Sequence, residues 1–234
     1  MRAVGFEKLQ SLMASVIGQI LPLAFAVALS TVPIIAAILI LLSPAKPRVS
    51  IALLIGWAAG VGIVVGVFTV GFGFTTSTLR PGDDPFAGII RILLGTALIA
   101  YAITRFLRRL GDEQTNETPK WMRAAERTNA PGALGFGFAL ALRPKNLILS
   151  IAAAAIIGEA SLGVADGVVV IVFYTVIGIS TVAAPIVAHL AAPERTEEPL
   201  NSIRDWIMKN NAPMLLVVII MTGAVIIGSG ISKL

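Results

Sequence analysis

Long apolar stretches separated by short charged segments run through the whole chain. Four of them contain no Asp, Glu, Lys or Arg: residues 9–45, 49–79, 167–193 and 210–232. Each is longer than the about 20 apolar residues that a helix needs to cross about 30 Å of hydrocarbon. With two further spans that carry internal charge, the pattern predicts six membrane-spanning helices at 16–42, 50–73, 86–107, 133–157, 167–190 and 212–231.

The composition supports an all-α integral membrane protein and excludes other classes. Hydrophobic residues make up 56% of the 234 positions and charged residues 13%, against roughly 25% charge in soluble domains. The chain has no cysteine and a single histidine, His189, so we expect no metal, no cofactor and no thiol chemistry. We expect no enzyme, because no carboxylates cluster with histidine or cysteine. The low fraction of charged residues argues against a nucleic-acid-binding protein.

The distribution of basic residues sets the expected orientation. Eleven of the 18 basic residues fall in or beside the first, third and fifth loops: Lys46, Arg48, Arg105, Arg108, Arg109, Lys120, Arg123, Arg127, Arg195, Arg204 and Lys209. The opposite side carries Arg2, Lys8, Arg80 and Lys233. Because short basic loops stay in the cytoplasm, we predict a multi-pass protein of the cytoplasmic membrane with both termini outside. A cleaved signal peptide is the less favoured alternative, since the first apolar stretch continues through Leu42.

The chain divides into two apolar units joined by a charged segment. We expect a three-helix unit at 1–107, a cytoplasmic charged loop at 108–132 and a second three-helix unit at 133–234. Within the second unit, residues 199–210 predict an interfacial amphipathic helix whose apolar face carries Leu200, Ile203, Trp206 and Ile207. The charge of the loop is interpreted as a solvated surface and a topology signal, with docking of a partner protein as the alternative.

The two units resemble each other where their first helices break. Phe25-Ala26-Val27-Ala28-Leu29 and Phe138-Ala139-Leu140-Ala141-Leu142 share four of five residues. Each sequence leads into a helix-breaking polar patch, Ser30-Thr31-Val32-Pro33 in the first span and Arg143-Pro144-Lys145-Asn146 in the fourth. Since three spans is an odd number, the second unit would be inverted relative to the first. Inverted repeats with paired broken helices are typical of the binding sites of secondary transporters.

The patch in the fourth span is the strongest candidate for a binding site. Arg143 and Lys145 fall at the middle of this span, where each costs about 2.5–3.5 kcal/mol on insertion scales. Pro144 lacks an N–H, leaves the carbonyl of Leu140 without its helical donor and disfavours helical geometry at Arg143. The half-helix beginning at Asn146 would direct free N–H groups at the same place. These groups suit a sulfate, phosphate or carboxylate; snorkelling of both cations to the interface is the alternative.

Other polar residues are weaker candidates. The first break and the fifth span supply further substrate-binding candidates: Ser30, Thr31, Pro33, Tyr174, Thr175, Ser180 and Thr181. Serine and threonine in membrane helices also bond commonly to their own backbone or to a neighbouring helix. His189 and Lys145 are the candidates for proton coupling, with an ordinary interfacial histidine as the alternative at position 189.

Several short motifs resemble those of the lysine-exporter (LysE) superfamily. They are Ser30-Thr31-Val32-Pro33, Lys46-Pro47-Arg48, Ile55-Gly56-Trp57 and Arg143-Pro144-Lys145-Asn146, the last of which matches an Asn-Pro-Lys signature at Pro144 and Lys145. The nearest likeness is to the actinobacterial glycolipid-addressing group, known as Sap or GAP proteins. The resemblance implies six helices in a three-plus-three inverted repeat and outward movement of cell-envelope lipids. Arg143 departs from the signature, and the added cation shifts the site toward anionic ligands.

These features favour a secondary transporter that exports or flips an anionic glycolipid, or a related envelope lipid or precursor. Alternating access would rock one repeat against the other. One alternative is a proton-coupled exporter of amino acids or small metabolites; another is a non-transporting membrane scaffold for glycolipid biosynthesis. Membrane lipids are the expected partners, with envelope-lipid biosynthesis or export proteins and a second copy of the chain as further candidates.

Overall fold

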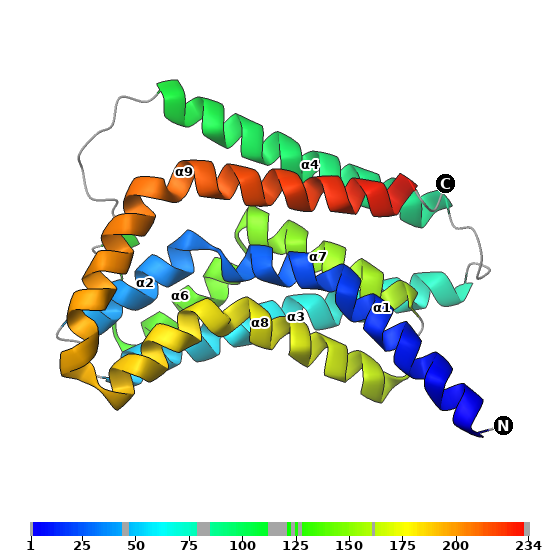
Figure 1. Ribbon diagram of the computed structural model, residues 1–234, viewed down its shortest axis with the longest axis horizontal. Helices are drawn as coiled ribbons and strands as arrows, with labels where there is room; N and C mark the ends of the chain where they lie inside the picture. The colour runs from blue at the N-terminus through cyan, green and yellow to red at the C-terminus, as the bar shows by residue number, and fades with distance from the viewer. Residues whose placement is uncertain are drawn as a thin grey trace.

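The computed structural model describes residues 2–43, 47–78, 85–111, 121–122, 125, 128–160 and 162–231, and nearly all of these are helical. The helices are α1 (Arg2–Ala28), α2 (Thr31–Leu42), α3 (Pro47–Thr78), α4 (Pro85–Gly111), α6 (Ala130–Ala141), α7 (Pro144–Glu159), α8 (Val164–Ala191) and α9 (Pro193–Ile231). The start of α1 and the end of α9 lie at the same end of an elongated bundle (Figure 1). The predicted all-α class is confirmed for the described residues.

Several helices are long and apolar enough to cross a membrane. Gln10–Ala28 within α1, Pro47–Gly73 within α3 and the whole of α8 meet this condition, and the bent pair α6–α7 gives a fourth candidate span. α2 and the segment Gly88–Thr104 of α4 are shorter apolar helices. Large apolar side chains are exposed along α8, among them Val168, Val172, Val176 and Val187, as expected for a surface that faces lipid. The chain is therefore a multi-pass membrane protein.

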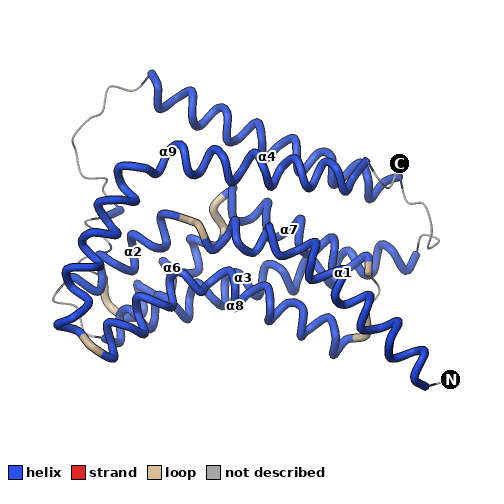
Figure 2. Tube along the Cα trace, viewed as in Figure 1, coloured by secondary structure: helices blue, strands red, loops and turns tan. Residues whose placement is uncertain are grey.

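Two helices are interrupted near the middle of the bundle. α1 ends at Ala28 and α2 starts at Thr31, while α6 ends at Ala141 and α7 starts at Pro144. The axes of α6 and α7 differ by 64°. Figure 2 shows both interruptions as short loop segments in the middle of the long axis. They are the two breaks that the sequence predicts around residues 30–33 and 143–146.

α2 and α3 lie at the centre of the bundle. Ten of the 12 residues of α2 are buried, and α3 contacts α6, α7 and α8 extensively. α1 contacts α7 and α8, whereas α4 contacts mainly α9. α4 and the later part of α9 lie side by side along one edge of the molecule (Figure 1). The first break is thus enclosed by other helices, whereas the second break combines buried residues, Lys145 and Asn146, with exposed ones, Leu142 and Pro144.

Glycine allows the closest of these helix contacts. A Cβ atom on Gly56 of α3 would collide with the backbone of Leu134 in α6, and one on Gly137 of α6 would collide with the backbone of Trp57 in α3. Small residues at such positions let helix backbones approach each other in membranes. A Cβ atom on Gly66, further along α3, would meet no atom within 4 Å. The α3–α6 contact therefore depends on particular glycines and not on glycine content in general.

The predicted charged loop differs from the structure. α4 continues through Gly111 and α6 begins at Ala130, so helices extend into both ends of the segment 108–132. Met122 is buried in the hydrophobic core, whereas the charged side chains on which the predicted solvated surface depends lie outside the described residues, so that interpretation stays a prediction. Residues 112–120, 123–124 and 126–127 lie outside the described residues.

The predicted amphipathic helix at 199–210 is not a separate element. It is continuous with the last apolar helix as α9, which changes direction in its orange part in Figure 1. Leu200 and Ile207 are buried, whereas Ile203 and Trp206 are 45% and 56% exposed. Residues seven apart return to the same side of a helix after two turns, so the bundle covers only the side of Leu200 and Ile207.

We expect Gly56→Ala to lower the unfolding temperature of the detergent-solubilised protein, because the added methyl group must push α3 away from α6. Overpacking of this kind costs about 1–3 kcal/mol. Gly66→Ala is the matched control, since alanine there has open space and favours the helix by about 1 kcal/mol. Thermal unfolding followed by intrinsic fluorescence compares the two variants. Equal unfolding temperatures would contradict the glycine-dependent contact.

Candidate functional site

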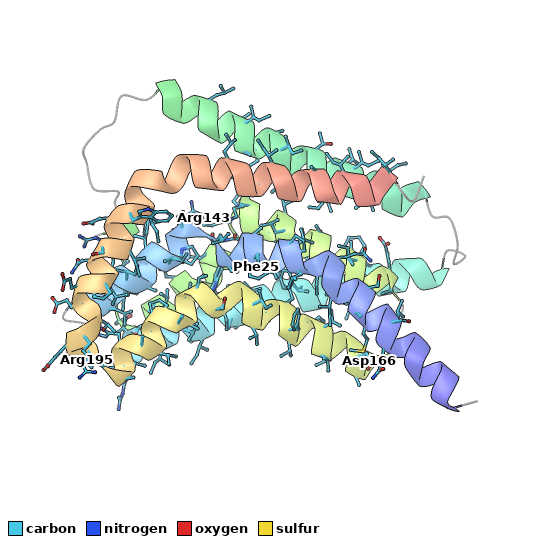
Figure 3. The ribbon with its side chains drawn as sticks, viewed as in Figure 1. Phe25, Arg143, Asp166 and Arg195 are labelled. Carbon is cyan, nitrogen blue, oxygen red and sulfur yellow. The ribbon has the colours of Figure 1, made fainter. Side chains whose placement is uncertain are left out.

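The two helix breaks share a small cavity inside the bundle. Its volume is about 30 Å³, enough for about one or two water molecules. Its lining comes from the breaks and from α4 and α9: Ser30, Thr31, Val32, Tyr101, Arg143, Lys145, Asn146 and Ile219. In Figure 3, Arg143 lies well inside the two ends of the bundle, which are marked by Arg195 and Asp166. Two polar patches that are distant in sequence therefore meet inside the bundle.

Pro144 determines the local structure of the second break. The residue before it, Arg143, has an extended backbone with φ −61° and ψ 142°, as residues that precede proline prefer. Pro144 cannot donate to the carbonyl of Leu140, and this carbonyl instead accepts a hydrogen bond from the side-chain amide of Asn146 at 3.0 Å. The sequence identifies the freed carbonyl, and the structure identifies the residue that bonds to it.

A side chain from another helix performs the same role at the first break. The hydroxyl of Thr181 in α8 donates a hydrogen bond to the carbonyl of Ala28, the last residue of α1. Because lipid supplies no water to such carbonyl groups, they must be bonded within the protein. Thr181, a predicted substrate ligand, therefore closes the end of α1 and does not line the cavity.

Two helix N-termini and two basic side chains make the electrostatic potential in the cavity positive. Thr31 and Val32 at the start of α2 line it, as do Lys145 and Asn146 at the start of α7, and neither helix has a side-chain cap. Each helix N-terminus carries roughly +0.5 of an elementary charge. Arg143 and Lys145 add two cations, and none of the described residues that line the cavity is Asp or Glu. An anion bound here would interact favourably with all four groups.

Four of the polar residues at the cavity are almost completely buried: Ser30, Thr31, Lys145 and Asn146. Lys145 is 7% exposed and Asn146 is 1% exposed. The Oδ1 atom of Asn146 accepts no hydrogen bond from the described residues. A buried acceptor without a donor costs about 1–3 kcal/mol, and such atoms are usually satisfied by ordered water or by a ligand. The amide nitrogen of Asn146 thus donates to the Leu140 carbonyl at the break, and its oxygen is available to accept a hydrogen bond from a polar ligand.

Several predicted site residues do not line the cavity. Pro33 is buried within α2, and Pro144 is exposed at the start of α7. The hydroxyl groups of Thr175 and Ser180 donate to carbonyls of their own helix at 2.8 and 2.7 Å. This is the ordinary behaviour of Ser and Thr in membrane helices that the sequence leaves open as the alternative.

Tyr174 and His189 also lie away from the cavity. Tyr174 is fully buried in α8, where its hydroxyl approaches Ser150 of α7 without a hydrogen bond of ordinary geometry. His189 lies in the last turn of α8, and its Nδ1 atom is 2.8 Å from the hydroxyl of Thr196 in α9. This hydrogen bond connects the end of α8 to the start of α9.

Sequence reasoning missed the part of the cavity that α4 and α9 contribute. Tyr101 is one of only two tyrosines in the chain, and a polar ring in a predicted span is a signal that could have found it. Ile219 is one of many apolar residues in the last span, and nothing in the sequence distinguishes it. Val32 lies inside the predicted first break but was not among the candidates.

A known family matches nearly all of the chain. The family model described as Sap, sulfolipid-1-addressing protein, matches residues 20–232. The chain belongs to this family. The Sap match includes both breaks and every residue that lines the cavity. The predicted likeness to the Sap group is therefore confirmed, while membership of the LysE superfamily stays a prediction. No curated protein and no solved structure matches the chain.

We expect Asn146→Leu to destabilise this Sap-family chain, because the Leu140 carbonyl would lose its side-chain donor at 3.0 Å and keep only weaker backbone donors such as the Arg143 N–H at 3.4 Å. A hydrogen bond of this kind contributes about 0.5–1.5 kcal/mol. The matched control is Thr175→Val, whose hydroxyl bonds only within α8 in the described structure. Thermal unfolding in detergent, followed by circular dichroism, measures both. An unfolding temperature of Asn146→Leu equal to that of the control would contradict the role of Asn146 in closing the break.

Proposed function

We propose that this chain is a secondary transporter that exports or flips an anionic envelope glycolipid, or a related lipid precursor, across the cytoplasmic membrane. The observation that carries the proposal is the cavity where two helix N-termini without side-chain caps meet the basic residues Arg143 and Lys145. The family description names a sulfolipid. A sulfate group is an anion of the kind that charged hydrogen-bond donors bind.

In this proposal the headgroup binds between the two helix breaks. Arg143 and Lys145 bind its acidic group, and the hydroxyl groups of Ser30 and Thr31 donate hydrogen bonds to it from the first break. The free Oδ1 atom of Asn146 accepts a hydrogen bond from a headgroup hydroxyl. A cavity of about 30 Å³ is too small for a lipid headgroup, so transport by alternating access requires the cavity to widen.

Six spans in two inverted repeats form the second part of the proposal. α1–α2, α3 and α4 would correspond to α6–α7, α8 and α9. If the two units are repeats, each contact between them should have an equivalent in which every helix is replaced by its counterpart. The equivalent of the α3–α6 contact is α8–α1. The equivalents of α3–α7 and α4–α7 are α8–α2 and α9–α2. All of these contacts are present. The shared location of the start of α1 and the end of α9 (Figure 1) supports an even number of spans.

Orientation, coupling and partners complete the proposal. The basic residues favour both termini outside, and the motifs favour a place in the LysE superfamily. Lys145, inside the cavity, is a better candidate for proton coupling than His189, which bonds to Thr196 at the end of α8. We propose no catalytic role for the chain, and envelope-lipid proteins or a second copy of the chain as its partners.

Transport in proteoliposomes tests the headgroup site. We expect Arg143→Gln and Lys145→Gln, singly and together, to slow movement of a fluorescent sulfatide (a sulfated galactosylceramide) by about tenfold or more. A hydrogen bond to a charged group contributes about 1.5–3 kcal/mol, and about 1.4 kcal/mol corresponds to a factor of ten. Arg195→Gln is the matched control, because it removes an exposed arginine at the start of α9.

Two results would count against the proposal. Wild-type sulfatide transport in both cavity variants would exclude the cavity as the headgroup site. Accumulation of an amino acid in cells that lack the protein, with unchanged envelope lipids, would favour the small-metabolite exporter instead.

A further inference from the structure

By their mutual contacts, the described helices fall into two groups, and these groups differ from the two proposed repeats. α1, α2, α3, α6, α7 and α8 are joined by many mutual contacts, whereas α4 contacts chiefly α9 and to a small extent α7. Within the part of the chain that the structure describes, no comparable contact joins α4 to α1, α2 or α3. We call α4 together with residues 216–231 of α9 the α4–α9 pair, and the six other helices the core.

Two glycines hold the α4–α9 pair together. A Cβ atom on Gly95 would collide with the backbone of Gly223, and one on Gly223 would collide with the side chain of Ile99. Leu98 and Ile226 are buried beside them. Buried positions spaced three or four residues apart on both helices are typical of a closely fitted helix pair. Separating α4 from α9 would break this contact, so the pair is built to move as one unit.

The core contains an equally close contact between the repeats. Gly56 and Gly137 join α3, in the first repeat, to α6, in the second. Rocking one repeat against the other would have to break this contact and the Gly95–Gly223 contact together. Movement of the α4–α9 pair against the core would leave both contacts intact. Each contact of α4 with α7 and of α9 with α1, α2 and α8 is smaller than the α4–α9 and α3–α6 contacts, and these smaller contacts form the boundary between the α4–α9 pair and the core.

The cavity lies on this boundary and has two chemically different sides. The core supplies its cations and hydroxyl groups through residues such as Arg143, Lys145 and Ser30, and the α4–α9 pair supplies Tyr101 and Ile219. An aromatic ring and an aliphatic side chain suit hydrocarbon, whereas the opposite side suits an anion. Such a two-sided cavity fits an amphipathic ligand that is oriented with its polar end toward the breaks.

We propose that the α4–α9 pair is a lateral gate for the acyl chains of the transported lipid. The pair moves away from the core as a unit, and the acyl chains then pass along Tyr101 and Ile219 while the headgroup binds at the breaks. The nature of the cargo rests on the function proposed above. The division into moving parts rests on the helix contacts alone.

Distances between spin labels test the gate directly. The chain has no cysteine, so labels can be attached at chosen exposed apolar positions: Ile63 in α3, Leu93 in α4, Val172 in α8 and Ile220 in α9. Double electron–electron resonance is measured in phosphatidylcholine nanodiscs with and without sulfatide. We expect the pair Ile63→Cys with Ile220→Cys, which joins the core to the gate, to give the broadest distribution and to shift by several ångström with sulfatide.

Two control pairs of spin labels test whether the α4–α9 pair and the core each move as a rigid unit. Leu93→Cys with Ile220→Cys lies within the α4–α9 pair, and Ile63→Cys with Val172→Cys lies within the core. Both should give narrow distributions that sulfatide does not change. A shift between Ile63 and Val172 would overturn the gate in favour of rocking repeats, because α3 and α8 belong to different repeats.

Other outcomes separate the gate from the proposed function. If the distance distributions of all three label pairs have equal widths without sulfatide, the gate is overturned whatever the cargo is. An unchanged core-to-gate distance while sulfatide transport persists would overturn the gate and leave the proposed function standing. Loss of the Arg143 and Lys145 effects on transport, with a broad core-to-gate distance, would overturn the headgroup site and leave the gate standing.

Discussion

A bilayer offers no water to a broken helix, and the rest of this structure depends on how the two breaks meet that constraint. Every carbonyl that a break frees must find a donor inside the protein. Asn146 supplies one to Leu140, and Thr181 supplies one to Ala28. The carbonyl ends of the broken helices are thus bonded, whereas the N-terminal ends of α2 and α7 carry no side-chain cap. This asymmetry gives the site its preference for negative charge.

The same arrangement gathers positive charge at the cavity. The starts of α2 and α7 bring two positive helix ends to one cavity, beside Arg143 and Lys145. Like charges repel more strongly in a medium of low dielectric constant than in water, so a bound anion lowers the energy of all four groups at once. A cation would find neither a carboxylate in the lining nor a free carbonyl at Leu140 or Ala28.

The sequence predicts the breaks well because their causes are local. Pro144 removes a donor and extends Arg143 whatever surrounds them. Tyr101, Ile219 and the partner of Ala28 could not be predicted in this way, since they depend on which helices become neighbours. Apolar periodicity also leaves open that Leu200 and Ile207 are buried by the bundle while Ile203 and Trp206 are exposed, because an apolar residue in a membrane protein is as stable against lipid as against the core. Periodicity therefore identifies a span without identifying its buried side.

Inverted repeats do not require that the repeats are the moving units. The glycine contacts at Gly56 and Gly95 each join helices that we assign to different repeats in our proposal, so movement of one proposed repeat against the other would have to break both contacts. Placing the cavity at the boundary between the α4–α9 pair and the core also suits the energetics of a lipid. Moving acyl chains into water costs about 0.8 kcal/mol for each CH₂ group, which a lateral opening avoids entirely. In the proposed mechanism the protein then has to enclose only the headgroup, for which the two cations and the two helix ends at the cavity are suitable binding groups.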